Sequence, residues 1–228
     1  MHKFNHFISI GYVCDAVGLM SSKQTAAKRE EAYAFDRIAT PMWAVTELFQ
    51  NGFEQFLEPS NATSGKLFEH DDTEIVFDER YYIRYPINKP HIHRVATLSE
   101  VFNKRKDRMI QLLSKAETNG EPVLFIRTEE RASYPDRGRR LIFDEYVEKY
   151  SKPESYYLQV FDGVIKNLYP ALKYKILYFN DAGVQEIGEN IVTLPASKKD
   201  YRSFEVGAEL SSIIKEHSQY LENKMSDI

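Results

Sequence analysis

The stretch Phe7-Ile8-Ser9-Ile10-Gly11 is a short, mostly apolar run that ends at a glycine. Such a run is typical of a buried strand followed by a turn. Three further runs of this kind follow along the chain, at residues 123–126, 174–179 and 191–194. Short strands that are apolar throughout and are separated by helices are typical of a parallel sheet with both faces covered. The sequence therefore predicts an α/β fold of three layers, with a mostly parallel sheet flanked by helices.

The segments between these runs show the spacing of apolar residues that is typical of helices. The pattern predicts helices over residues 41–56, 98–115, 155–168 and 204–225. Thr40 precedes Pro41 and is a suitable residue to cap the first helix. We expect the apolar stripe of that helix to pack in the core: Trp43, Val45, Leu48, Phe49, Phe53 and Phe56.

An acid-rich segment, at about residues 66–94, lies between the first two predicted helices. It is rich in Ile, Val, Phe and Tyr, but acidic residues interrupt it and Pro86 and Pro90 end its strand-like part. We expect it to form an irregular insertion. No repeat, low-complexity tract or clear linker divides the chain, so the sequence predicts a single α/β domain over residues 1–228.

The composition limits the classes of function. The chain has 228 residues, with 30 Lys and Arg against 34 Asp and Glu, and this near-neutral balance argues against a dedicated nucleic-acid-binding protein. Its single cysteine, Cys14, can form neither an internal disulfide nor a multi-cysteine metal site, and it suits a reducing compartment. No apolar stretch reaches the roughly 18 residues of a membrane-spanning helix. We therefore expect a cytoplasmic protein without a transmembrane segment.

Two predicted loops are candidates for a ligand site, because ligands bind outside the carboxyl ends of parallel strands. The first loop begins Gly11-Tyr12 and leads to Cys14; the second runs from Arg127 to Arg131. Gly11, Tyr12, Arg127 and Arg131 are the residues that we expect to contact a ligand. Arginine suits carboxylate or phosphate groups, although a solvated, salt-bridged loop is the alternative for this arginine-rich stretch.

The most reactive side chain in these loops is Cys14. If it lies near the start of a helix, its thiolate is favoured and the thiol can act as a nucleophile; a buried structural thiol is the alternative. His70, which Asp71 follows, is a candidate base, with a surface histidine as the alternative. His91 and His93 form a pair with metal-ligand spacing, but Arg94 beside them would repel a cation, so we expect no metal. Motifs for dinucleotides and for phosphate-binding loops are absent, and we expect no cofactor.

Four motifs together carry a family resemblance: residues 7–14, 32–38, 43–57 and 68–71. They resemble a bacterial and viral family of unknown function that is usually labelled papain-like cysteine peptidase. That family has a strand ending in S-L-G-x-N-C, a Y-P-F-D-W-I element, a helix running into D-F-x-x-F-L, and a later F-x-H-D. The resemblance implies that Cys14 is the nucleophile, His70 the general base, and Asp36 or Asp71 the carboxylate that orients the histidine.

Three functions remain open at this stage. The resemblance implies a cysteine-dependent hydrolase or transferase that acts on a peptide, a glycan or a small acidic substrate. Members of the family that the chain resembles also look at home among surface-polysaccharide genes. A glycan-related enzyme or binding protein is therefore the second hypothesis, in which Arg127 and Arg131 would hold an anionic glycan without covalent catalysis. An inactive scaffold is the third hypothesis, because Val13, Ala34 and Arg37 stand where the family pattern has Asn, Pro and Trp.

Overall fold

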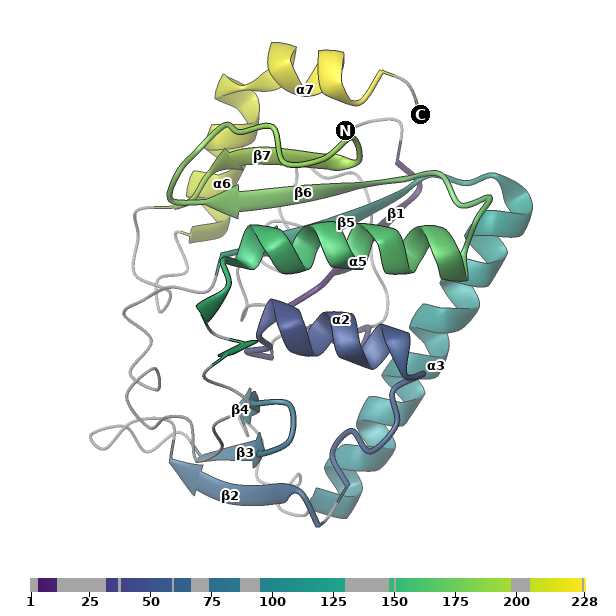
Figure 1. Ribbon diagram of the computed structural model, residues 1–228, viewed down its shortest axis with the longest axis vertical. Helices are drawn as coiled ribbons and strands as arrows, with labels where there is room; N and C mark the ends of the chain where they lie inside the picture. The colour runs from purple at the N-terminus through teal and green to yellow at the C-terminus, as the bar shows by residue number, and fades with distance from the viewer. Residues whose placement is uncertain are drawn as a thin grey trace.

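A computed structural model describes residues 4–11, 32–36, 38–58, 60–66, 74–86, 95–129, 148–149, 151–197, 206–226 and 228 (Figure 1). Four strands form a parallel sheet with the order β1-β5-β6-β7. Their bounds are His6–Ser9 for β1, Val123–Thr128 for β5, Tyr174–Asn180 for β6 and Ile191–Pro195 for β7. These are the four apolar runs of the sequence, so the predicted parallel sheet is confirmed.

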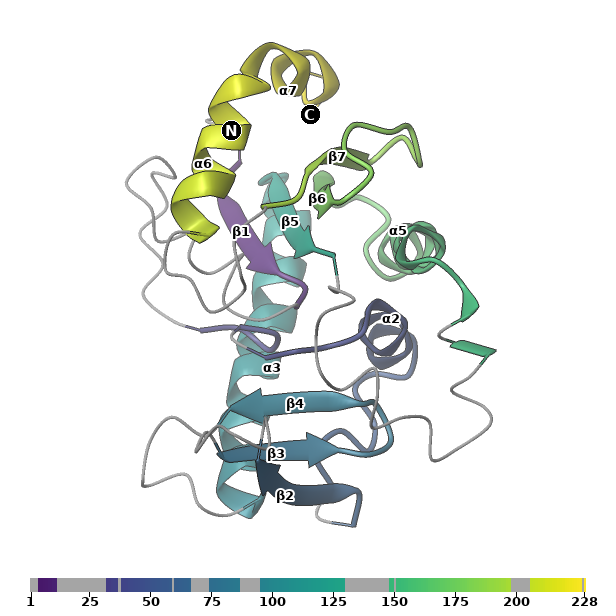
Figure 2. The same cartoon turned by 90° about the vertical axis from the view of Figure 1, so that its left-hand side faces the viewer.

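Helices cover both faces of this sheet. Side chains of β5 and β6 alternate between two apolar cores: Phe125 and Ile176 belong to one, whereas Leu124 and Leu177 belong to the other. The first core includes residues of α2 (Met42–Gln50), α3 (Val95–Asn119) and α5 (Glu154–Leu168), and the second includes residues of α6 (Val206–Glu216) and α7 (Ser218–Lys224). Figure 2 shows α5 and α6 on opposite sides of the sheet. The three-layer α/β fold is therefore confirmed.

A second, smaller sheet lies next to α3 and below α2 in the view of Figure 1. It is antiparallel, with the order β2-β3-β4: Ala62–Lys66, Glu74–Asp78 and Ile83–Pro86. The described part of the acid-rich insertion is thus more regular than expected. Glu74 and Asp78 lie at the two ends of β3 and Pro86 lies at the end of β4, where they interrupt few ladder hydrogen bonds.

The aromatic stripe after Pro41 is buried, as predicted, but it does not all lie in one helix. The helix α2 ends at Gln50, and the stripe continues through a turn in which Phe53, Gln55 and Leu57 have positive φ values of 65°, 57° and 49°. Pro41, rather than Thr40, occupies the N-cap position, and no side chain of the described residues caps this helix. The predicted cap and the predicted length of the helix were therefore wrong.

Within the described ranges, none of the helices combines the length and the apolar character that crossing a bilayer requires.

Candidate functional site

The loops after β1 and β5 begin at the same edge of the parallel sheet. The two strands are parallel neighbours with Ser9 opposite Ile126, and the backbone N–H of Ile10 continues the ladder by donating to the Ile126 carbonyl at 3.0 Å. The carboxyl ends of β1 and β5 therefore lie side by side. This is the arrangement in which α/β proteins bind ligands.

Gly11 forms the turn at the end of β1. Its φ of +89° lies in the left-handed region, and a Cβ at this position would lie 2.9 Å from Nη1 of Arg127 and 3.1 Å from Cβ of Thr40. Both the backbone conformation and the close approach require a glycine. The glycine that ends the first apolar run of the sequence is therefore required by the backbone conformation and by the close packing at the end of β1.

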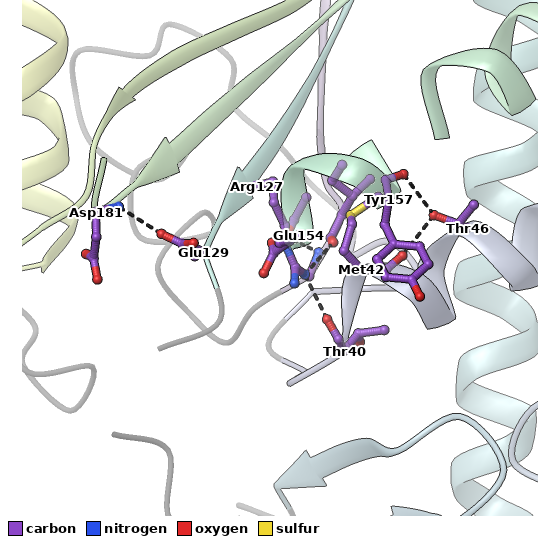
Figure 3. Close-up of polar contacts among 11 residues, drawn as sticks. Thr40, Met42, Thr46, Arg127, Glu129, Glu154, Tyr157 and Asp181 are labelled. Atoms are coloured by element: carbon purple, nitrogen blue, oxygen red, sulfur yellow. Dashed lines mark hydrogen bonds and ion pairs between the residues drawn. The ribbon is translucent and has the colours of Figure 1, made fainter. Parts of the chain in front are cut away.

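Arg127 is buried beneath this turn, with no exposed surface. Its Nη1 donates to the carbonyl oxygen of Ile10 at 3.0 Å and to that of Thr40 at 2.8 Å, and its Nε donates to Oε1 of Glu154 at 2.5 Å. Figure 3 shows the guanidinium between Glu154 and Thr40. Arg127 lies at the edge where the sequence placed it, but these contacts are with the protein itself. Ligand binding by Arg127 stays a prediction.

Glu154 is the residue that the sequence analysis did not anticipate. It is the first residue of α5, directly after Pro153 in the N-cap position, and its side chain is 10% exposed. A carboxylate in the first turn of a helix is stabilised by the exposed N–H groups there. The Pro-Glu sequence at the start of a helix predicts the position of Glu154, but no local signal identifies its partner 27 residues earlier.

Further carboxyl groups lie at the same edge. Glu129 follows β5, and its Oε2 accepts a hydrogen bond at 2.8 Å from the backbone N–H of Asp181, which follows β6 (Figure 3). Burial raises the pKa of the Glu129 carboxyl; the hydrogen bond from Asp181 opposes this rise and the charge of Glu154 adds to it. Burial also raises the pKa of the Tyr178 hydroxyl, which faces the same carboxylates. The carboxyl edge of the sheet therefore combines the buried Arg127 guanidinium with the Glu129 carboxyl, whose raised pKa means that it binds a proton more tightly than an ordinary glutamate.

Asp36 is the one predicted catalytic residue that lies among the described residues. It is 3% exposed, and its Oδ2 accepts a hydrogen bond at 2.6 Å from the backbone N–H of Tyr33. Ala39, three residues later, pairs with Arg84 of β4 through two backbone hydrogen bonds of 3.0 and 2.9 Å. Asp36 therefore fixes a local turn beside the segment that leads to Thr40. Its orienting role toward a histidine stays a prediction.

The other predicted site residues lie outside the described residues: Tyr12, Cys14, His70, Asp71, Arg131 and the pair His91 and His93. Their contacts with Gly11, Asp36 and Arg127 are therefore predictions from the sequence. Among the described residues, no three His, Cys, Asp or Glu side chains lie close enough together to hold a metal ion.

The fold and the polar edge define a class: a three-layer α/β protein with a candidate site at the carboxyl ends of parallel strands. The model of the family described as "Putative papain-like cysteine peptidase (DUF1796)" matches residues 5–144, and the chain belongs to this family. The predicted family resemblance is thereby confirmed. No curated protein and no solved structure matches the chain. The matched range includes β1, both sheet-edge residues Gly11 and Arg127, and the positions of Cys14 and His70, but it ends before Glu154.

Proposed function

We propose that the chain is a cysteine-dependent hydrolase or transferase with Cys14 as its nucleophile. The observation that carries this proposal is the family match over residues 5–144, combined with the constrained turn at Gly11. Cys14 follows that turn by three residues, and a backbone that must be left-handed at Gly11 leaves the sheet in a defined direction. A nucleophile needs such a fixed approach to its substrate.

In the proposed reaction each predicted catalytic residue has one role. In the first step the Cys14 thiol loses its proton to the His70 imidazole, and Sγ forms a bond to the acyl carbon of the substrate. The bond from that carbon to the leaving group breaks, and the leaving group takes the proton from the imidazolium. Water, or an acceptor in a transferase, then attacks the thioester carbon and gives a proton to the His70 imidazole. The C–S bond breaks, which releases the acyl product and returns the Cys14 thiolate. Asp36 or Asp71 would hold the imidazole in the orientation that this transfer needs.

The substrate part of the proposal comes from the resemblance. It includes a peptide, a glycan or a small acidic molecule, in the setting of surface-polysaccharide biosynthesis. A cytoplasmic location belongs to the same proposal, since a lone reactive thiol persists in a reducing compartment.

A site that binds an anionic glycan through Arg127 without covalent chemistry has less support. The Arg127 guanidinium is buried and contacts Glu154 and two backbone carbonyls, so its charge is already balanced by a carboxylate of the protein itself. Arg131, the second arginine of that hypothesis, lies outside the described residues.

Alkylation by iodoacetamide at pH 6 and pH 9 tests the proposal. Because Cys14 is the only cysteine, the mass of the intact chain reports on this one thiol. An ordinary thiol with a pKa of about 8.5 reacts at pH 6 with roughly 1% or less of its rate at pH 9. We expect the native chain to keep at least about a tenth of that rate, because an activated cysteine is a thiolate near pH 6.

The His70→Ala variant is the control for the base. We expect it to lose the reaction at pH 6 and to keep the reaction at pH 9, where the thiol ionises without help. A native chain that behaves as an ordinary thiol, or that never reacts, would contradict a nucleophilic Cys14.

A further inference from the structure

Three segments of the chain meet at the buried guanidinium of Arg127. The carbonyl oxygen of Ile10 belongs to the end of β1, that of Thr40 belongs to the segment before α2, and Glu154 begins α5. Arg127 itself is in β5, a central strand. The planar guanidinium presents its N–H donors in a fixed fork that spans these groups, whereas a lysine gathers its three donors at a single nitrogen.

We propose that Arg127 and Glu154 act as a positioning pair for the Gly11 turn. The pair holds the Ile10 carbonyl, and thereby fixes the peptide plane from which the chain leaves β1. The direction in which the following residues start, toward Cys14, depends on this plane. The consequence for Cys14 rests on the proposed function; the effect on the Gly11 turn does not.

Burial makes this pair sensitive to substitution. Arg127 has no exposed surface, and the side chain of Glu154 is 10% exposed. A buried guanidinium is stable only when acceptors and a countercharge surround it. The two carbonyl oxygens and the carboxylate supply these, so the charge-assisted hydrogen bonds of one guanidinium join both carbonyls to Glu154. The guanidinium is therefore an internal group that orders the backbone, and not a group that waits for a substrate anion.

The pair also connects two parts of the chain. Arg127 lies within residues 5–144, which match the family model, whereas Glu154 lies beyond them. The helix α5 thus supplies the carboxylate that pairs with Arg127, and the region that matches the family model does not contain this carboxylate. Nothing in the family description assigns a role to Glu154.

The test uses the full chain with Arg127→Met and Arg127→Lys, and Lys224→Met as a matched control. Lys224 Nζ pairs with Oε1 of Glu186 at 2.6 Å, and both side chains are exposed. Its substitution therefore removes an exposed ion pair from a part of the sequence far from Gly11. Hydrogen exchange is measured at the amides of Ile10, Gly11 and Ala39, with the amides of β6 and β7 as internal references. Alkylation of Cys14 by iodoacetamide is measured at pH 6 and pH 9.

We expect both Arg127 variants to exchange at least about tenfold faster at Ile10, Gly11 and Ala39, with smaller changes in β6 and β7, and the control to be unchanged. We also expect alkylation at pH 6 to fall about tenfold in both variants, which corresponds to about one pKa unit of the thiol. If Arg127→Lys shows the same changes as Arg127→Met, a positive charge alone is not sufficient, and the planar guanidinium is required. A role in stability alone would lower the melting temperature but leave the ratio of the two alkylation rates unchanged. If Arg127→Met does not fold, the milder Glu154→Gln variant carries the same test.

The outcomes separate this inference from the proposed function. Unchanged exchange in both Arg127 variants, or full rescue by lysine, would overturn the positioning pair even if Cys14 is reactive. Faster exchange at the turn, in a chain whose native Cys14 behaves as an ordinary thiol, would support the pair and contradict the proposed function.

Discussion

Gly11 combines a left-handed backbone with close contact to two neighbouring segments. An alanine there would have to keep a φ of +89° and place its Cβ 2.9 Å from Arg127. The left-handed conformation alone costs a residue with a Cβ about 1–2 kcal/mol, and the close contact adds to this. We expect Gly11→Ala to lower the free energy of unfolding by at least about 2 kcal/mol, as measured by urea denaturation.

Gly163 offers a matched control within α5. A Cβ there would meet no atom within 4 Å. Because alanine favours a helix over glycine by about 0.5–1 kcal/mol, we expect Gly163→Ala to stabilise the chain. Equal effects of the two substitutions would contradict the constraint at Gly11.

The buried carboxyl of Glu129 makes the stability of the chain depend on pH. Burial raises the pKa of this carboxyl in the folded chain, so the folded chain binds its proton more tightly than the unfolded chain does. The corresponding stability is present below the unfolded pKa of about 4.3 and is lost as the pH rises through the higher folded value. The native chain should therefore lose stability relative to Glu129→Gln as the pH rises. Melting temperatures of both chains between pH 4 and pH 8 measure this, and a constant difference would contradict the raised pKa.

The place of each site residue in the fold could be predicted more readily than its contacts. The apolar run ending at Ile126 placed Arg127 at the carboxyl edge, and Gly11 marked the turn opposite. The sequence could not show that Arg127 is buried against Glu154, because that ion pair joins residues far apart in the chain and neither charge has a local pattern. No local signal predicts the burial of Glu129, because its hydrogen bond comes from Asp181 after the neighbouring strand β6.

At the scale of elements, the turn that follows α2 has an unusual backbone. Phe53, Gln55 and Leu57 are left-handed without being glycine. Asp78 holds this turn: its buried carboxylate accepts the backbone N–H of Leu57 at 2.7 Å and that of Tyr81 at 3.0 Å. Burial raises the pKa of the Asp78 carboxyl, and these hydrogen bonds partly offset the rise. The helical spacing of the aromatic residues predicted a longer helix, because no sequence signal revealed a carboxylate from the neighbouring sheet.

This turn can be tested with glycine, which tolerates the left-handed conformation. Gln55 is exposed, with a φ of 57°. Gln55→Gly removes about 1 kcal/mol of backbone strain, which offsets the greater freedom of glycine in the unfolded chain, so we expect a change in stability within about 0.5 kcal/mol. Gln111→Gly, an exposed position inside α3, should cost about 1 kcal/mol in the same urea measurement. A similar loss at both positions would show that Gln55 carries no strain.

At the scale of the whole molecule, the region that matches the family does not complete the parallel sheet. It contains β1 and β5, whereas β6, β7 and α5 lie beyond residue 144. Both faces of β5 are buried: Phe125 contacts residues of one core and Leu124 those of the other, and both cores include side chains of β6. The alternation of apolar runs with helices along the entire chain made this architecture predictable, because each run is long enough for a strand and too short for a helix.

The incomplete sheet leads to a prediction about truncation. A fragment of residues 1–144 would expose one edge and much of both faces of β5, so we expect no cooperative unfolding transition by circular dichroism. The full chain should unfold cooperatively under the same conditions. A cooperative transition in the fragment would contradict the view that the C-terminal third completes the fold.

Single-turnover acylation by p-nitrophenyl acetate tests the central claim most directly. If Cys14 is the nucleophile, one equivalent of p-nitrophenolate should be released in a rapid burst near pH 6.5, and the intact chain should gain one acetyl group that maps to Cys14. Cys14→Ser should show neither the burst nor the thioester, and His70→Ala should slow the burst by a factor of roughly 10²–10⁴. A native chain without a burst, or a burst that persists in Cys14→Ser, would contradict the account.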